Sequence, residues 1–146
     1  MIRLDDVRTQ LEAQVGELQG RTGNAREFSN LVESGQLPQT TPHAFVIFSG
    51  MQGGQADAVS GLFLQSYSET TSVVLMVRTA NDPLGDRAID EITPIVRAVI
   101  KALAGWAPED AIGVFQLARA ELVGARTGVL VFQIDFTLND QLRIPR

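Results

Sequence analysis

Cysteine is absent from this sequence of 146 residues, and histidine and lysine each occur once, as His43 and Lys101. The lack of cysteine excludes disulfides, thiolate metal sites, iron–sulfur clusters and cysteine nucleophiles. A single histidine leaves only His43 for a Ser-His-Asp arrangement, and it excludes a zinc site built on two histidines. These absences remove several classes of enzyme and metalloprotein.

Long apolar runs are also missing, because no run approaches the ~20 residues that a membrane span needs. The first 20 residues carry acids and glutamines where a signal peptide would have an apolar core. We therefore expect an intracellular protein without a membrane partner. The formal net charge is −5 and the arginines are scattered along the chain, so no basic face for nucleic acid is expected.

The remaining composition is that of an ordinary globular chain, with 45% hydrophobic and 20% charged residues. The length fits one domain spanning residues 1–146. Composition by itself points toward a packing or assembly role and names no particular function.

Apolar residues recur at helical spacing in three places. The first stripe predicts a helix over residues 5–19 that Asp5 or Asp6 caps and Gly20 ends. A second, short helix around Phe28 is predicted to end at Gly35. A third helix is predicted to end near residue 104, and at Pro94 it either starts afresh with Thr93 as its cap or kinks. The stripe of the first helix is Leu4, Val7, Leu11, Val15 and Leu18, and that of the third is Ile89, Ile92, Val96, Val99 and Leu103.

Strand patterns occupy much of the rest. We predict strands over residues 43–49, 62–67, 71–79, 115–123 and 129–138, with a bend near Glu69 and Thr70. The first, which follows an extended stretch between Pro38 and Pro42, is predicted to be covered on both faces. Residues 50–57 are flexible by composition, and residues 124–128 are predicted to connect two strands of a hairpin. The order of elements predicts an α+β fold, with a mainly antiparallel sheet of about five strands and two or three helices on one face.

The glycine-rich segment 49–54 lacks the glycine spacing of a nucleotide-binding fingerprint and has no following lysine. Asp86 and Asp90 lie four residues apart on the predicted third helix, and Asp82 precedes them, so together they are a conceivable divalent-metal site. The helix macrodipole favours acids in the same place without any metal. We therefore predict no catalytic residue, metal or cofactor site.

Other polar and aromatic residues have similarly plain interpretations. Glu109 and Asp110 follow Pro108 as a solvated loop would, and His43 has no obvious catalytic partner. Trp106 is predicted to anchor the end of the third helix to the core. The last strand has a polar face that meets either water or another subunit, and its residues are Gln133, Asp135 and Thr137.

Taken together, the segments resemble the tail terminator proteins of long, non-contractile-tailed bacteriophages, including prophage copies. The resemblance covers most of the chain. It is carried by residues 42–46, by Asn81-Asp82-Pro83-Leu84-Gly85-Asp86-Arg87-Ala88, by Ala102-Leu103-Ala104-Gly105-Trp106-Ala107-Pro108 and by Phe132-Gln133-Ile134-Asp135-Phe136.

The resemblance implies a homo-hexameric ring that binds the last ring of the major tail tube protein, stops polymerisation and offers its other surface to a head-completion or connector protein. The protein would sit at the head-proximal end of the virion tail, with DNA passing through its lumen. Chemistry alone suggests subunit or tube contacts at Gly50, Met51, Gln52, Gly53, Gly54, Arg126, Thr127, Gln133, Asp135 and Thr137. The alternatives are a tail tube or head–tail joining subunit and, from another class, a small metal-dependent enzyme.

Overall fold

The computed structural model describes residues 1–78, 86–126 and 128–146. In chain order its elements are α1 (Leu4–Gln14), the 3-10 turn η1 (Gly16–Leu18), β1 (Thr22–Gly23), α2 (Ala25–Ser34), β2 (His43–Val59), β3 (Leu62–Arg78), α3 (Asp86–Leu103), β4 (Phe115–Arg126) and β5 (Val129–Pro145). Among the described residues, no helix has both the length and the apolar character needed to cross a membrane.

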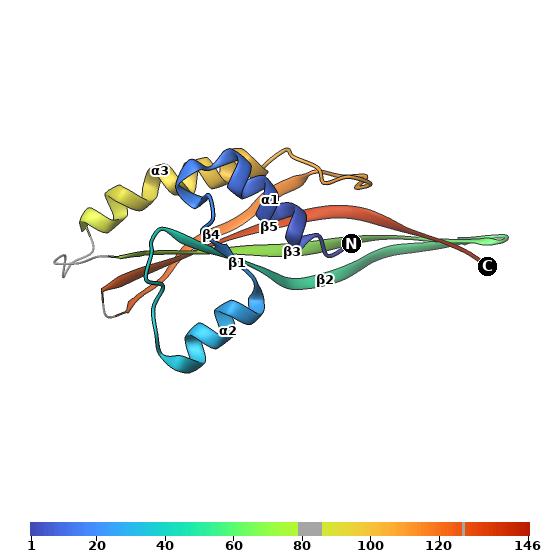
Figure 1. Ribbon diagram of the computed structural model, residues 1–146. Helices are drawn as coiled ribbons and strands as arrows, with labels where there is room; N and C mark the ends of the chain where they lie inside the picture. The colour runs from blue at the N-terminus through green and yellow to red at the C-terminus, as the bar shows by residue number, and fades with distance from the viewer. Residues whose placement is uncertain (79–85, 127) are drawn as a thin grey trace.

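One sheet organises the chain, with the strand order β1-β2-β3-β5-β4. Every pairing is antiparallel except that of the two-residue β1 with β2, so the predicted α+β class and mainly antiparallel sheet are confirmed. Figure 1 shows α1 and α3 on one face of the sheet and α2 on the other. Two of the predicted helices therefore share a face, and the third covers the opposite one.

The first helix is shorter than predicted. α1 ends at Gln14, Val15 is extended, and Gly16 begins the separate turn η1. The apolar spacing persists across this break because Val15 and Leu18 are still buried against the same core. The predicted cap is also wrong: Arg3 occupies the N-cap without a side-chain bond, and the two aspartates lie in the first turn, where the macrodipole favours them.

The second helix begins earlier than the apolar residues alone indicate. The side chain of Asn24 accepts a hydrogen bond from the Glu27 backbone N–H (2.9 Å), and Gly35 ends the helix with a left-handed φ of 68°, as predicted. β1, which the sequence did not predict, precedes it and pairs with Ala44 and Phe45 of β2. A strand of two residues has too little pattern to be recognised from sequence.

β2 runs from His43 to Val59, so the prediction of a flexible loop over residues 50–57 is wrong. The segment pairs with β3 from Gly50 opposite Thr70 to Val59 opposite Leu62. Hydrogen bonding to a long neighbouring strand here overrides the low strand propensity of glycine. A β-carbon on Gly54 would lie 2.6 Å from the hydroxyl oxygen of Ser66, so glycine permits this close approach of the two strands.

Three further boundaries differ from the sequence predictions. β3 is continuous across Glu69 and Thr70, so no bend separates two strands there. β4 continues to Arg126, which makes the connection predicted over residues 124–128 too long, and Thr127 lies outside the described residues. β5 extends past Leu138 to Pro145, because β3 continues beside it as a partner.

α3 is a single helix with Pro94 inside it, so it does not start afresh at Thr93. The hydroxyl of Thr93 donates to the carbonyl oxygen of Ile89 (2.7 Å), as threonine commonly does within a helix. The turn predicted at residues 81–85 lies outside the described residues.

The core has two parts, one on each face of the sheet. The larger part packs α1, η1 and α3 on the sheet, and Gln10 links the two helices by donating to the carbonyl oxygen of Ala102 (3.1 Å). The smaller part lies under α2, where the ring of Phe28 lies 5.3 Å from that of Phe45. Burial of residues 44–46 confirms that the start of β2 is covered on both faces.

Candidate assembly surfaces

The sheet projects beyond its helices as a three-stranded arm, which we define as residues 50–59 of β2, 62–68 of β3 and 139–145 of β5 (Figure 1). Ten extended residues correspond to about 30 Å of length. Every residue from 51 to 59 is exposed, and within the arm only Tyr67 is buried. An arm with almost no core of its own is a surface available to other molecules.

The arm has strand edges on both sides. β1 pairs only with Ala44 and Phe45, so within the described structure β3 is the only strand beside residues 46–59 of β2. On the other side, the pairing of β4 with β5 stops at Leu138. β3 is the only described strand that pairs with residues 139–145 of β5, and Gly113 lies against the backbone of Asn139 at the start of this stretch. Both edges therefore present backbone N–H and C=O groups that another strand can bind.

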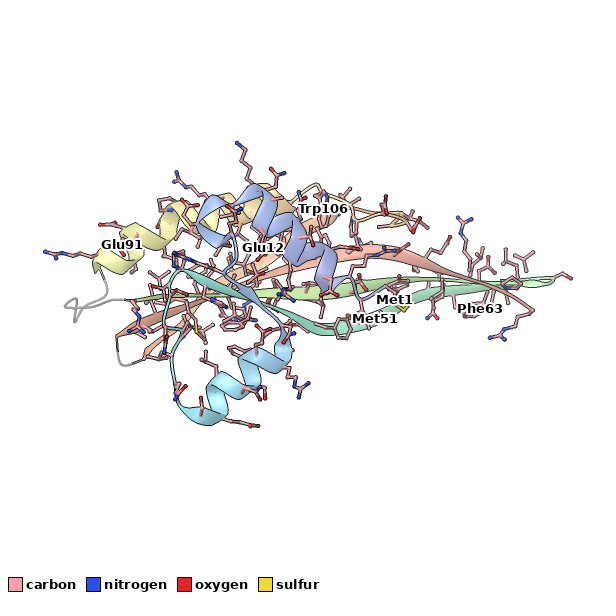
Figure 2. All side chains as sticks on the ribbon, in the orientation of Figure 1. Met1, Glu12, Met51, Phe63, Glu91 and Trp106 are labelled. Atoms are coloured by element: carbon pink, nitrogen blue, oxygen red, sulfur yellow. The ribbon has the colours of Figure 1, made fainter. Side chains whose placement is uncertain are left out.

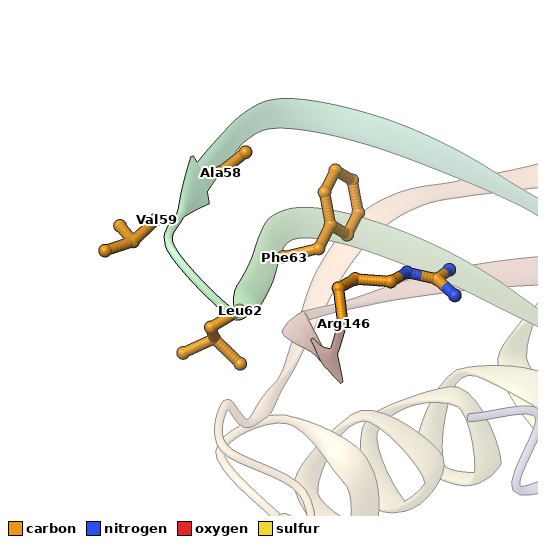
Figure 3. Close-up of a pocket in the computed structure, with 5 residues that line it drawn as sticks. All are labelled: Ala58, Val59, Leu62, Phe63 and Arg146. Carbon is orange, nitrogen blue, oxygen red and sulfur yellow. The ribbon is translucent and has the colours of Figure 1, made fainter.

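The tip of the arm carries apolar side chains on both faces, because Ala58 pairs with Phe63 and the adjacent Val59 pairs with Leu62. Ala58, Val59, Leu62, Phe63 and Arg146 line a shallow pocket of about 230 Å³ there (Figure 3). Figure 2 shows Phe63 far from the helices, and the backbone N–H of Arg146 donates to the carbonyl oxygen of Gly61 (2.9 Å). The C-terminal residue is thereby attached to the hairpin turn.

The base of the arm contains a buried acid that the sequence did not single out. Glu69 is 1% exposed and accepts a hydrogen bond from the backbone N–H of Ile2 (2.9 Å). Its other carboxylate oxygen, Oε1, is buried and has no partner in the described structure. Burial raises the pKa of the neighbouring Tyr67, and Asp140 and Glu69 raise it further. In the sequence, Glu69 lies between the polar residues 68 and 70. No apolar pattern there predicts that Glu69 is buried.

The predicted polar face of β5 lies on the same side of the sheet as α2. Gln133, Asp135 and Thr137 are half-buried. Asp135 Oδ1 accepts hydrogen bonds from the Ser72 hydroxyl (2.6 Å) and from Gln133 Nε2 (2.9 Å), and the Ser72 hydroxyl is also bonded to that of Ser49. This carboxylate is engaged within the chain, while α2 leaves the face around it partly open.

The free edge of β4 carries exposed apolar side chains that were not among the contact residues expected from the sequence. Leu117 is 46% exposed, Leu122 48% and Val123 56%. Leu122 and α3 line a groove of about 360 Å³, while Val123 and α2 line another of about 510 Å³ on the opposite face. The adjacent apolar residues Leu122 and Val123 could have indicated this edge in the sequence. They break the strict alternation of a strand at the point where β4 has a register shift.

Of the three acids considered as a metal site, only Asp90 has its side chain in the described part of the chain. No group of three or more His, Cys, Asp or Glu side chains suited to an ion occurs there. Asp82 and the side chain of Asp86 lie outside that part, and Asp90 is exposed on α3. Glu109 and Asp110 are exposed, and the carbonyl oxygen of Glu109 accepts a hydrogen bond from Arg3.

Replacing Asp86 and Asp90 together by alanine is expected to leave assembly intact. The free energy of unfolding should fall by a few tenths to about 1 kcal/mol, because acids near a helix N-terminus favour the macrodipole. Urea denaturation and complementation of particle production measure the two effects, with Asp6→Ala, an exposed acid in the first turn of α1, as a comparison. A double variant that folds normally but yields no particles contradicts this prediction and restores the metal hypothesis.

His43 is half-buried at the start of β2, with its ring 4.7 Å from that of Phe45. Its Nδ1 is buried without a hydrogen-bond partner in the described structure. Burial lowers the pKa of His43, Arg21 and Arg8 lower it further, and Glu27 opposes them. This geometry is that of an imidazole packed against the aromatic ring of Phe45.

The lowered pKa makes the folded state bind fewer protons than the unfolded state near pH 6.5. The stabilising contribution of neutral His43 is therefore complete above the unfolded pKa and declines as the pH falls through and below it. Urea denaturation between about pH 7.5 and about pH 5.5 should show stability decreasing on acidification. The His43→Gln variant should show a weaker decrease, and an identical slope in both proteins would contradict the prediction.

Trp106 lies just after α3 and packs on the larger core. Its indole stacks on the ring of Phe115, with centroids 5.9 Å apart and an interplanar angle of 12°. A backbone hydrogen bond joins the same two residues, since the Phe115 N–H donates to the Trp106 carbonyl oxygen (2.8 Å), and the Gly105 N–H donates to the Phe115 carbonyl oxygen (2.8 Å). These contacts tie the end of α3 to the start of β4.

The protruding arm, the open strand edges and the exposed apolar residues along one edge are surfaces that can bind other protein chains. Residues 2–146 match the phage tail terminator protein family. The chain belongs to this family, which makes it a component of a bacteriophage virion tail and indicates a structural rather than an enzymatic role. No curated protein matches the sequence significantly.

Proposed function

We propose that the protein forms a homo-hexameric ring that caps the tail tube of a long, non-contractile-tailed phage. The ring binds the last ring of the major tail tube protein and stops its polymerisation. Its opposite surface receives a head-completion or connector protein, so the ring occupies the head-proximal end of the tail after assembly in the host cytoplasm. The family match over nearly the whole chain carries this proposal.

The surfaces of the chain support the proposal. The arm extends about 30 Å from the body and ends in apolar residues, which gives it the reach to contact a neighbouring subunit or the tube. The glycine-rich segment Gly50, Met51, Gln52, Gly53 and Gly54 lies along one edge of this arm. Gln133, Asp135 and Thr137 lie on the partly open face, and the end of β4 near residue 126 is a further candidate contact.

The lumen of such a ring must let DNA pass. A six-fold ring of this chain would carry a formal charge of about −30, because each copy contributes −5. We propose a neutral to acidic lumen that does not bind DNA specifically. A strongly basic lumen would bind the DNA phosphates and slow the passage of the DNA.

Deletion of the gene from the phage or prophage tests the function directly. We expect heads without functional tails, together with overlong tubes, and restoration of normal particles by the intact chain supplied in trans. The purified protein should be a ring or a monomer by light scattering. Capping would be contradicted by tubes of normal length in the deletion mutant. It would also be contradicted by open-ended filaments of the purified chain that lengthen with concentration, which would indicate a tube subunit.

A further inference from the structure

The long strands of the sheet leave two edges that are complementary in direction. β2, β3, β5 and β4 are consecutive and antiparallel, so the two outer strands, β2 and β4, run in opposite directions. If β2 of a second copy is placed beside β4, the antiparallel alternation continues across the junction. The same contact can then be repeated from copy to copy.

Apolar side chains of β4 and β2 also lie in the same cross-strand rows of the sheet. Leu117 of β4 is opposite Phe136, which is opposite Thr71, which is opposite Phe48 of β2. Residues joined in this way lie on the same face of the sheet. The next such row runs from Phe115 through Leu138 and Glu69 to Met51. Both edges therefore carry apolar residues at equal height on the face that bears α1 and α3.

The exposure of these residues agrees with a missing neighbour. Leu117 is 46% exposed and Met51 is 41% exposed, while Phe48 is half-buried. Beyond Phe45 no described strand covers the outer edge of β2, and none covers that of β4. Unpaired backbone flanked by exposed apolar side chains indicates a binding edge.

We propose that the edge of β4 binds the edge of β2, around residues 46–53, in a second copy of this chain. This inference rests on the proposed ring and names the strands that close it. Pairing brings Leu117 of one copy beside Phe48 or Met51 of the next and continues the sheet from subunit to subunit. A two-fold pairing of β4 with β4 would cover Leu117 but leave the β2 edge and Met51 in water. The β4–β2 contact covers both the start of β4 and residues 46–53 of β2, and it ends where β1 occupies the β2 edge at Ala44 and Phe45.

The absence of cysteine allows a direct test by disulfide cross-linking. Leu117→Cys protein is mixed under mild oxidation with Phe48→Cys, Met51→Cys or Gly53→Cys protein, which together allow for a stagger of the strands. Within one chain, residues 48 and 117 are three strand spacings apart, about 14 Å, which exceeds the ~7 Å between α-carbons that a disulfide tolerates. Any cross-link therefore joins two copies.

We expect disulfide dimers in at least one mixture, and a ladder ending at the ring size when both substitutions are in one chain. Leu117→Cys alone, and Lys101→Cys on the exposed end of α3 as a collision control, should stay monomeric on non-reducing gels. Absence of a cross-link with all three β2 variants would overturn the proposal, as would dimers of Leu117→Cys alone, which indicate β4–β4 pairing.

Electron microscopy of the uncross-linked protein separates this inference from the proposed function. Rings, or caps on tube ends, without a cross-link between the Leu117→Cys protein and any β2 variant would overturn the strand pairing and leave the terminator function standing. Cross-links accompanied by open-ended filaments would support the pairing and contradict termination.

Discussion

A chain with a shortened arm should fold normally and yield no functional tails. We consider the variant in which residues 55–65 are replaced by Asn-Gly, a two-residue turn suited to antiparallel strands, and in which the chain ends at Gln141, because residues 142–145 pair with the removed part of β3. All buried residues of the two core clusters lie outside the removed segment, so the body is expected to keep its helices and its cooperative unfolding. The reach of the arm would be lost together with its apolar tip.

Circular dichroism and thermal unfolding check that the variant folds, and complementation of a deletion phage measures function. The matched control is Asp57→Asn, which keeps the length of the arm and changes one exposed side chain. Full complementation by the shortened variant would show that the arm contacts neither a neighbouring subunit nor the tube.

Replacement of Phe136 by alanine should have the largest effect on stability. Phe136 is completely buried in the larger core. Removing a buried phenylalanine side chain costs about 3–5 kcal/mol, a large part of the ~5–15 kcal/mol that stabilises a typical domain. Urea denaturation should show a correspondingly lower midpoint, or a chain that is mostly unfolded at 37 °C.

Leu117→Ala is the matched control, because Leu117 pairs with Phe136 across the strands but is 46% exposed. In the monomeric chain its free energy of unfolding should change by about 1 kcal/mol or less. Equal losses for the two variants would mean that Leu117 is as well packed as Phe136 in solution, and would place a neighbouring chain on that edge.

Sequence reasoning succeeded where one face of an element is buried. The apolar stripe of α1 continues through η1 because burial of Val15 and Leu18, rather than helical backbone, maintains the spacing. The periodicity therefore identified the core residues correctly and placed the end of the helix wrongly.

The arm could not be predicted from its own composition. Residues 50–57 contain three glycines and no buried side chain, so no apolar alternation marks them as a strand. Their structure depends on β3, which is far more strand-like and in turn pairs with β5 up to Pro145. Contacts between distant parts of the chain decide such a segment, and local propensity does not contain them.

Because the arm has almost no core, its length can change within the family without a change in the packed body. An insertion of two residues in each strand would lengthen the arm by about 6.6 Å and keep every side chain on its present face, without repacking any buried residue. A single-residue insertion would instead turn the apolar tip residues Val59 and Phe63 toward the opposite faces. Arm length can therefore vary in two-residue steps while the helices and the body of the sheet stay unchanged, which makes reach a property that evolves separately from fold stability.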